Sequence, residues 1–532
     1  MTGPGRPRTW LPPVLAGAAS VALGLGAAEL AAALVAPSAS PIVVVGAAAI
    51  DFAPSWAKDA AIALFGTADK AALLVGIGVV LAVAAGAAGV LQARRAPAGR
   101  LLLAAGAILG VGAAITRAGA SVFDVVPSTV AAVVAALALG PLLRRIPDAA
   151  TPAPSAEPAR TGATRAPAAA AAAVEPAPPG TTRREFLTWA GGATLLGGLA
   201  AAGGLALQAG ARAVTAFRDA LTLPRAAVAA PPVPDGAELG IRGLAPVITP
   251  NAEFYRIDTA LQIPRVDPAT WRLRITGLVE QEVELTFDDV LALPLEESRT
   301  TLMCVSNEVG GDLIGTALWL GYPVRELLSQ ARPLPEADMV LSRSRDGWTA
   351  GTPLEVLQEE DRNAILAIGM NGEPLPEEHG FPARLVVPGL YGYVSATKWV
   401  TELRLTRFDQ STAYWTDRGW GERGPVKLQS RIDVVRPVDG GALVAGVAWH
   451  QHTGVAGVQV RVDEGPWQEA ELATAISADT WVQWRATLDP APGEHTLQVR
   501  AISADGEVQT GVVRGVLPDG ATGYHTVRTR IP

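Results

Sequence analysis

Cysteine is almost absent from this chain of 532 residues, in which Cys304 is the single example. A lone thiol cannot form an internal disulfide, so the fold does not depend on one. No GxGxxG, P-loop, HExxH or CxxC motif occurs, which removes the common nucleotide-binding and zinc-binding classes. The formal net charge of −8 and the lack of a basic aromatic stripe argue against nucleic acid as a partner.

The first part of the chain has few charges and no histidine. Residues 1–220 consist mainly of Ala, Gly, Leu and Val, whereas residues 240–532 have the composition of an ordinary globular protein. Four apolar runs of spanning or near-spanning length predict a four-helix transmembrane region over 1–145. They cover 11–36, 70–92, 101–118 and 122–143. A further apolar stretch, 42–66, is interrupted by Asp51, Pro54, Lys58 and Asp59, which favours a loop or an interfacial helix.

Positive charges predict how this region is oriented. Arginines precede the first run, separate the second from the third, and follow the fourth, and such clusters face the cytoplasm. They are Arg6 and Arg8, then Arg94, Arg95 and Arg100, then Arg144 and Arg145. An even number of spans that starts in the cytoplasm agrees with this placement.

A Pro- and Ala-rich linker covers 146–182 and is too poor in large apolar residues to pack. Over 183–212, Arg183 and Arg184 precede an apolar run, which is typical of a twin-arginine export signal; the alternative is a fifth transmembrane helix. Both interpretations release residue 215 onward on the periplasmic or extracellular side. An internal export signal has a physical reason only if the exported domain is loaded with a cofactor before it leaves.

The soluble part predicts two domains in a multidomain chain. Short strands and scattered short helices over 240–427 indicate an α+β domain. We expect strands at 271–275, 283–286 and 384–387, and helices at 287–292 and 323–331. Regularly spaced short strands over 428–532 predict an immunoglobulin-like β-sandwich. Its strands are expected at 441–449, 455–463, 480–488, 494–503 and 506–513.

Cys304 lies where a strand is expected to end. Thr301 to Val305 alternates like a strand, and the polar and glycine residues of 306–311 then break the pattern. A single cysteine is usually a small buried hydrophobe, but strand-to-loop junctions hold functional groups more often than strand interiors do. From these residues alone we expect an exposed thiol of undefined use.

Five sequence blocks in the second half resemble the sulfite oxidase family of molybdopterin enzymes. They are ITPNAEFYRID (248–258), WRLRITGLVE (271–280), TLMCVSNEVGG (301–311), NGEPLPEEHGFPARLVVPGLYGYVSATKW (371–399) and SRID (430–433). The resemblance runs from about 245 to 532. It implies a catalytic domain that binds one molybdenum–molybdopterin cofactor, followed by an immunoglobulin-like domain through which two chains form a homodimer.

The resemblance also implies site residues. Cys304 matches the metal-ligating cysteine, and a soft thiolate suits molybdenum. Pterin-contacting positions of the family match side chains at Asn251, Tyr255, His379, Arg384 and Lys398, with backbone contacts from Ser395 and Ala396. The pterin carries an anionic phosphate, for which a guanidinium is well suited.

Substrate-side positions depart from the family pattern. Arg256 matches an anion-binding arginine, but Trp420 stands where animal and plant sulfite oxidases have an active-site tyrosine. Where their second domain supplies an arginine, this chain reads AWHQHTG, so that His450 and His452 either replace that charge or are simply exposed. These departures leave sulfite itself open as the substrate.

Three functions follow from the sequence. The first is a membrane-anchored molybdenum oxidoreductase that transfers an oxygen atom to or from a small sulfur or nitrogen oxyanion or oxide; its reductive form is a sulfoxide reductase acting, for example, on methionine sulfoxide. The second is a non-enzymatic membrane-anchored immunoglobulin-like binding protein. The third adds transport by the N-terminal helices. No CxxCH motif and no histidine in the apolar runs offers a haem site, so an external cytochrome or a quinone-linked membrane partner is expected to exchange electrons.

Overall fold

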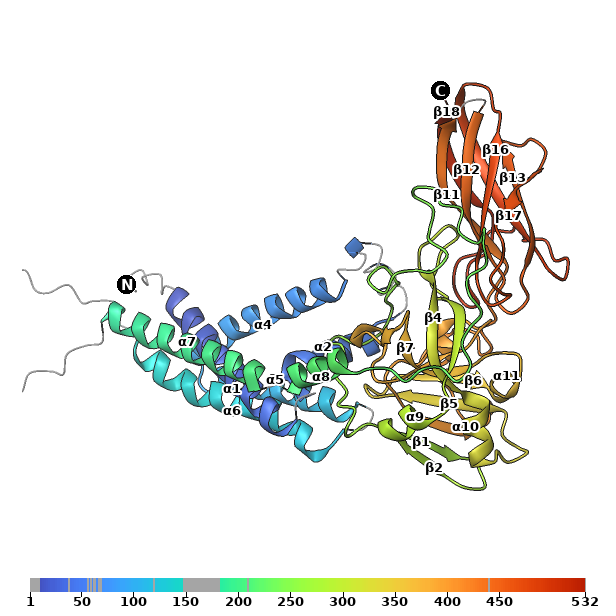
Figure 1. The fold of residues 1–532 in the computed structure, drawn as a ribbon. Coiled ribbons are helices and arrows are strands. Elements are labelled where there is room, and N and C mark those ends of the chain that lie inside the picture. Colours follow the sequence, from blue (N-terminus) through green and yellow to red (C-terminus); the bar gives the residue numbers. More distant parts are fainter. Residues whose placement is uncertain are drawn as a thin grey trace, which may run out of the picture. The chain divides into compact units, whose positions relative to one another are not determined.

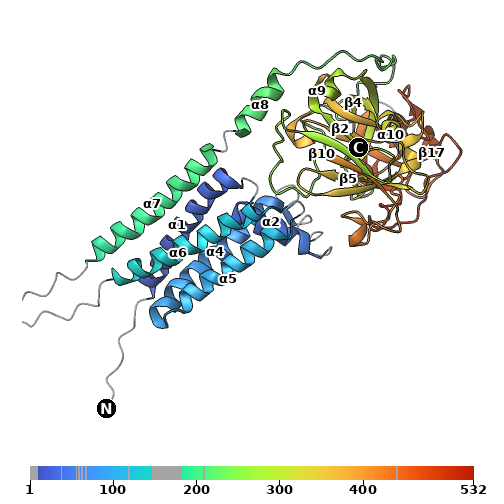
Figure 2. The ribbon, with the colours of Figure 1, turned by 90° about the horizontal axis from the view of Figure 1, so that it is seen from below.

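The computed structural model describes residues 10–36, 39–54, 57, 60, 64–65, 69–117, 120–146, 182–207, 210–438 and 441–531. The chain divides into two compact units, Met1–Ala209 and Gly210–Pro532. Each unit is described by itself (Figures 1 and 2). The predicted linker over 146–182 and the span 55–68 fall mostly outside the described residues.

The first unit is helical. Its described part contains five helices that are long and apolar enough to cross a membrane, and these coincide with the four predicted spans and the run after Arg183. They are α1 (Leu11–Val35), α4 (Asp69–Arg94), α5 (Ala98–Ile115), α6 (Val126–Arg144), which the short η3 (Val122–Val125) precedes, and α7 (Arg183–Leu207). The shorter apolar helix α2 (Pro41–Phe52) occupies the start of the stretch expected to be a loop or an interfacial helix.

Glycines allow the helices of this unit to approach closely. Helix α1 packs against α7, α6 and α4, and Figure 2 shows α7 running beside α1. A Cβ atom on Gly26 would overlap the backbone of Gly197, and one on Gly17 would overlap the backbone of Ala85. Small residues at such crossings are typical of helix pairs in membranes, where backbone contact replaces the hydrophobic effect as the source of association.

The second unit begins with the amphipathic helix α8 (Gly210–Ala220) and continues into an α+β domain built on two sheets. One sheet has the order β2-β1-β10-β5-β6, and the other has the order β3-β4-β7-β8 with β9 paired to β7. The first comprises β1 (Arg272–Gly277), β2 (Val283–Thr286), β5 (Met339–Ser344), β6 (Thr349–Pro353) and β10 (Val400–Thr406). The second comprises β3 (Glu296–Met303), β4 (Ile314–Pro323), β7 (Ile365–Met370), β8 (Glu373–Pro374) and β9 (Arg384–Val386).

Local sequence explains several of these elements. Every residue of β7 is buried, as expected of a short apolar run inside a domain. Helix α9 (Phe287–Ala292) begins with a capping box in which the side chains of Thr286 and Asp289 each accept a backbone N–H of the other residue. The remaining helices are α10 (Val324–Ala331), α11 (Leu354–Gln358) and α12 (Gly392–Ser395), with 3-10 turns η4 (Glu377–His379) and η5 (Thr416–Arg418).

The C-terminal part is a sandwich of two four-stranded sheets, ordered β11-β12-β16-β15 and β14-β13-β17-β18. Strands β12 (Gly441–Trp449), β13 (Val455–Val462), β16 (Val482–Leu488) and β17 (Gly493–Ser503) match the predicted ones. The other strands are β11 (Gln429–Val438), β14 (Gln468–Glu469), β15 (Glu471–Leu472) and β18 (His525–Ile531). The two sheets share a core that includes Val444, Val458, Trp484 and Leu497.

One predicted strand, 506–513, is wrong. Within it, Val508 forms only an isolated bridge with Ile502, and Val512 and Val513 are exposed. Strand β18 pairs with β17 along its full length instead, because the chain leaves the sheet after Ser503 and returns only at His525. The core of the α+β domain continues into the sandwich through Val447, Trp449 and Trp481, so the two domains pack on each other.

Candidate functional site

Cys304 follows β3 directly and begins the loop that leads to β4. Its backbone N–H donates to the Leu313 carbonyl at 3.0 Å, and its carbonyl accepts from the Asn307 N–H at 3.1 Å. The prediction of an exposed thiol was wrong, because only 9% of Cys304 is exposed and both of its neighbours, Met303 and Val305, are buried. Burial raises the pKa of the thiol, and hydrogen bonds from Ser306 act in the opposite direction.

The loop from Cys304 to Leu313 is held by a buried asparagine. Asn307 Oδ1 accepts from the Leu313 N–H at 2.8 Å, while its Nδ2 is buried without a hydrogen-bond partner among the described residues. An unpaired buried donor costs about 1–3 kcal/mol. This donor, three residues beyond the cysteine, is therefore available to a bound group.

Three of the predicted cofactor-contacting residues form one cluster. Arg384 Nη1 donates to the His379 carbonyl at 3.1 Å, and His379 Nε2 lies 3.3 Å from the Asn251 carbonyl. Burial, together with the charges of Arg384 and Lys398, lowers the pKa of His379 to about 3. The imidazole is therefore neutral at pH 7 and can act as a hydrogen-bonding group rather than a cation.

Arg384 is a buried cation that no carboxylate of the described residues compensates. Its side chain is 5% exposed, lies 5.0 Å over the Trp319 ring, and forms no ion pair with a carboxylate of the described residues. Burial lowers its pKa to about 10 because the charged form loses solvation. An uncompensated buried charge is costly to a protein, so this guanidinium is suited to an anionic ligand.

Two further cations, Lys398 and Arg256, share the carboxylate of Asp258. Lys398 Nζ donates to Asp258 Oδ2 at 2.7 Å and to the Glu378 carbonyl at 3.0 Å, and Arg256 Nε donates to the same Asp258 oxygen at 3.0 Å. Burial lowers the pKa of Lys398 to about 8, although Asp258 opposes this shift. Sequence reasoning missed Asp258, whose only signal was its position in the block that contains Asn251 and Tyr255.

Tyr255 connects the cysteine to this cluster. Burial raises the pKa of its hydroxyl, the Cys304 sulfur raises it further, and the Arg384 charge lowers it. A Cβ atom on Gly392 would lie 3.7 Å from the Met303 carbonyl and 4.0 Å from the Tyr255 hydroxyl. The start of α12 therefore lies beside Tyr255 and beside the residue that precedes Cys304. The structure thus brings the cysteine and the predicted pterin-contacting side chains into one region.

Ser395 and Ala396 are engaged within the protein. Ser395 is fully buried and its Oγ donates to the Tyr391 carbonyl at 3.0 Å, while the Ala396 N–H donates to the Gly392 carbonyl at 2.9 Å. The backbone contacts expected of these two residues stay a prediction.

Among the described residues, neither Trp420 nor His450 forms a hydrogen bond with Arg256, which pairs with Asp258 instead. Trp420 packs on the rings of Trp415 and Tyr393. His450 lines a cleft of about 510 Å³ between the α+β domain and the sandwich, and Arg362 and Arg423 line it too. The Nδ1 atom of His450 and both amide atoms of Gln451 are buried there without partners among the described residues.

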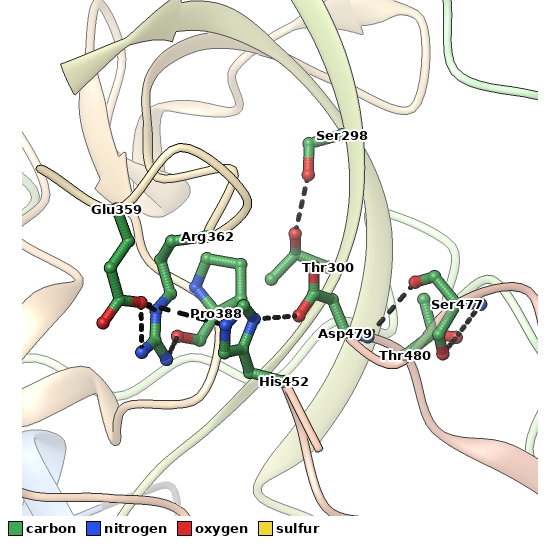
Figure 3. A network of polar contacts seen from close by, with 9 residues as sticks. All are labelled: Ser298, Thr300, Glu359, Arg362, Pro388, His452, Ser477, Asp479 and Thr480. Carbon is green, nitrogen blue, oxygen red and sulfur yellow. Dashed lines mark hydrogen bonds and ion pairs between the residues drawn. The ribbon is translucent and has the colours of Figure 1, made fainter. Parts of the chain in front are cut away.

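His452 forms a link between the two domains (Figure 3). Its Nδ1 lies 3.2 Å from Asp479 Oδ1 in the sandwich, and its Nε2 lies 3.8 Å from Glu359 Oε2 in the α+β domain. Glu359 also accepts from Arg362 Nη2 at 2.6 Å. Neither His450 nor His452 is fully exposed, which removes the expectation that both are simply solvent-facing.

The donor set fits a molybdenum–molybdopterin group. One soft, buried sulfur is present for the metal, a buried guanidinium without a carboxylate is suited to the phosphate, and a neutral histidine and a spare asparagine donor can bind a flat, polar ring system. The residues of the site therefore meet each requirement of the cofactor that the resemblance implies.

Comparison with known proteins gives matches to this part of the chain. Residues 260–415 match the model of the "oxidoreductase molybdopterin binding domain". The "uncharacterized oxidoreductase YuiH" of Bacillus subtilis (strain 168) is 35% identical over 158 residues, which cover 30% of this chain and 76% of that protein. Mitochondrial sulfite oxidase of Mus musculus is 29% identical over 342 residues, which cover 53% of this chain and 62% of that protein.

A solved structure is also similar. The sulfane dehydrogenase SoxCD from Paracoccus pantotrophus aligns with a TM-score of 0.48 and 24% sequence identity, and the match covers 55% of this chain and 82% of that one. The chain spans less than two thirds of the mouse sulfite oxidase that it matches.

Proposed function

Because this chain belongs to the sulfite oxidase family of molybdopterin oxidoreductases, we propose that it is a membrane-anchored enzyme that transfers an oxygen atom to or from a small sulfur or nitrogen oxyanion. The observation that carries the proposal is that Tyr255 interacts electrostatically with both the buried Cys304 and the buried Arg384, whose charge has no carboxylate partner among the described residues. A non-enzymatic binding protein has no use for this pair, because an unpaired buried cation lowers stability unless a ligand neutralises it.

Each residue of the site has a proposed role. Cys304 holds the metal, Arg384 and Lys398 bind the anionic tail of the pterin, and His379, Asn251 and Tyr255 bind its polar ring. When bound, molybdenum–molybdopterin supplies oxygen-atom transfer coupled to the movement of two electrons. His379 is neutral, and the charge of Lys398 is balanced by Asp258. The chain can therefore bind the cofactor without crowding positive charge around Arg384.

Arg256 is the proposed contact for the substrate anion. It shares Asp258 with Lys398, but 37% of its side chain is exposed, against 10% for Lys398. Arg256 can therefore meet a molecule that arrives from solvent, whereas Lys398 is enclosed. His450 and Trp420 remain the other proposed substrate-side residues.

The remaining parts of the chain have proposed roles as well. The five apolar helices are compatible with membrane anchoring, and we place the catalytic domain on the periplasmic or extracellular side, with Arg183 and Arg184 as an export signal. The sandwich is proposed to be an immunoglobulin-like domain that pairs two chains. Electrons are exchanged with an external cytochrome or a quinone-linked membrane partner.

Turnover assays on the purified full-length protein test this function. Sulfite oxidation with an artificial electron acceptor and methionine sulfoxide reduction with an artificial donor are compared, with Cys304→Ser as the matched variant. We expect oxygen transfer in one direction and its loss by at least about 100-fold in the variant, since a ligand of the reacting metal is removed. No turnover of either substrate, or wild-type turnover in the variant, would contradict the proposal.

A further inference from the structure

The sandwich contacts β3, the strand that ends directly before Cys304. The Thr301 N–H donates to the Asp479 carbonyl at 2.9 Å, and the Trp481 N–H donates to Thr301 Oγ1 at 2.9 Å. Thr301 is 2% exposed and Trp481 is 2% exposed, so these bonds are shielded from water. The backbone three residues before the cysteine is therefore held by the second domain.

The contact between Thr301 and Asp479 is stabilised by residues of the α+β domain. The Asp479 carboxylate accepts from His452, whose other ring nitrogen faces Glu359. Asp479 also sits in a turn in which its N–H donates to Ser477 Oγ at 3.2 Å. Figure 3 shows His452 between the two carboxylates and the Ser477–Thr480 turn beyond Asp479. The loop that holds Thr301 is thus tied to both domains.

The sandwich also contacts the loop that follows Cys304. Arg431 Nη1 donates to the Gly311 carbonyl at 2.8 Å, and its guanidinium is fixed by Asp433 at 2.5 Å, with both side chains about a tenth exposed. The His525 ring fills the space beside Gly310, where a Cβ atom would overlap it. The Ile432 N–H donates to His525 Nδ1 at 2.9 Å, which fixes the plane of the ring.

The loop needs such support from outside. Cys304 itself is held by two backbone hydrogen bonds, and both partners, Leu313 and Asn307, belong to the same loop. Gly310 has a φ of +82°, and Gly311 follows it, so this end of the loop has the wide conformational freedom of glycine. Inside the loop the Gly311 N–H donates to the Glu308 carbonyl at 2.9 Å, and Arg431 and His525 add restraint from outside the loop at Gly311 and Gly310.

We propose that the sandwich is a clamp that sets the position of the Cys304 sulfur, with Arg431 and His525 as positioning residues for the loop between β3 and β4. This role goes beyond dimerisation, and it rests on the proposed function in that the sulfur is taken as the metal ligand. Groups behind a metal ligand orient it and tune the metal. A loosened loop would therefore change the metal site without removing any of its ligands.

Hydrogen exchange of the full-length protein in detergent tests the Arg431 contact without any need for cofactor or activity. Arg431→Ala is expected to speed exchange of the amides in 304–313 by roughly tenfold, the effect of losing one charge-assisted hydrogen bond, and to leave β12 and β17 unchanged. Arg431→Lys is expected to restore part of the protection. Arg436→Ala, on the same strand but exposed and bonded to the Arg242 carbonyl, is the matched control and should behave as wild type.

Two results would overturn the clamp. One is unchanged exchange of 304–313 in Arg431→Ala; the other is faster exchange throughout the sandwich, which would make Arg431 a general stabilising residue. In protein that contains molybdenum, the Mo(V) electron paramagnetic resonance spectrum should also change in Arg431→Ala and not in Arg436→Ala. If the purified protein contains no molybdenum, the proposed function is contradicted. The hydrogen exchange of 304–313 still tests whether the sandwich restrains the loop.

A pair of substitutions tests the second contact even if Arg431→Ala fails to fold. Gly310→Ala places a methyl group against the His525 ring at a strained φ, and we expect it to speed exchange of 304–313. Adding His525→Ala removes the overlap and should restore part of the protection, leaving only the backbone strain. If the double variant exchanges as fast as Gly310→Ala alone, the His525 ring does not restrain the loop.

Discussion

At the scale of one residue, Arg384 is expected to lower the stability of the cofactor-free protein. Its guanidinium is buried without a carboxylate partner among the described residues, and burial lowers its pKa to about 10. Replacing an uncompensated buried charge by an apolar residue of similar volume is often neutral or stabilising. The same replacement removes the group best suited to the phosphate of the cofactor.

We therefore expect opposite effects of Arg384→Met on stability and on binding. The cofactor-free variant should unfold at the wild-type temperature or above it, and its pterin content after expression with cofactor synthesis should fall by at least about tenfold, the loss of one charge-assisted contact. Thermal unfolding and pterin fluorescence measure the two effects. A variant that is destabilised and still binds pterin normally would show that Arg384 has a structural role instead.

His379 makes the cofactor-free protein sensitive to acid. Its pKa in the folded chain is about 3, below the ordinary 6.5, so the unfolded chain binds more protons between these values. Stability is then fully present above about pH 6.5 and declines as the pH falls, with a slope of up to about 1.4 kcal/mol per pH unit.

Substitution of His379 by Gln is expected to flatten the acid limb of unfolding temperature against pH between about 6.5 and 4. His495→Gln is the control, because hydrogen bonds to Asp463 and the Ala491 carbonyl raise the pKa of this histidine and give it the opposite pH dependence. An unchanged acid limb in His379→Gln would mean that the imidazole is protonated in the folded protein.

At the scale of elements, the sequence predicts what local pattern determines. The capping box at Thr286 and Asp289 marks the start of α9, and the apolar run of β7 marks a buried strand. Strand β18 has no comparable signal, because six of its seven residues alternate between partial and full exposure without a clear apolar face. Its position depends on pairing with β17, which lies more than twenty residues earlier.

The residues of the site also divide into those that the sequence predicts and those that it does not. Cys304, His379 and Arg384 lie in blocks whose residue types and order could be read from the sequence. The burial of Cys304 could not, since its cover comes from segments distant in the chain. Asp258 was missed because its partner, Lys398, is distant in the chain. Asn307 was missed because its bond to the Leu313 N–H depends on the conformation of an irregular loop.

Close packing of α1 against α7 provides a test at the element scale. Gly197→Leu should lower the unfolding temperature of the helical unit in detergent, because its side chain would overlap the backbone at Ala22, and overpacking of this kind costs about 1–3 kcal/mol. Gly198→Leu, the next residue on α7, has open space beside its Cα and is expected to unfold as wild type. Equal behaviour of the two variants would argue against this helix pair.

At the scale of the whole molecule, an apolar helical unit is joined to a soluble unit with the features of a molybdopterin enzyme. The arginine clusters beside the helices lead us to expect the soluble unit outside the cytoplasm. An epitope tag after Pro532 should be reached by antibody on intact spheroplasts, whereas a tag after Met1 should be reached only after the membrane is permeabilised. The reverse pattern would place the enzyme in the cytoplasm.

The central claim is that Cys304 and the Arg384 cluster hold a molybdenum–molybdopterin cofactor. The most direct measurement is the molybdenum and pterin content of the full-length protein, purified from cells that make the cofactor, beside Cys304→Ser and Arg384→Met. We expect about one metal and one pterin per chain in the wild type, as for one soft protein ligand, and clear losses of pterin in Arg384→Met. Wild-type protein that contains neither molybdenum nor pterin would contradict it.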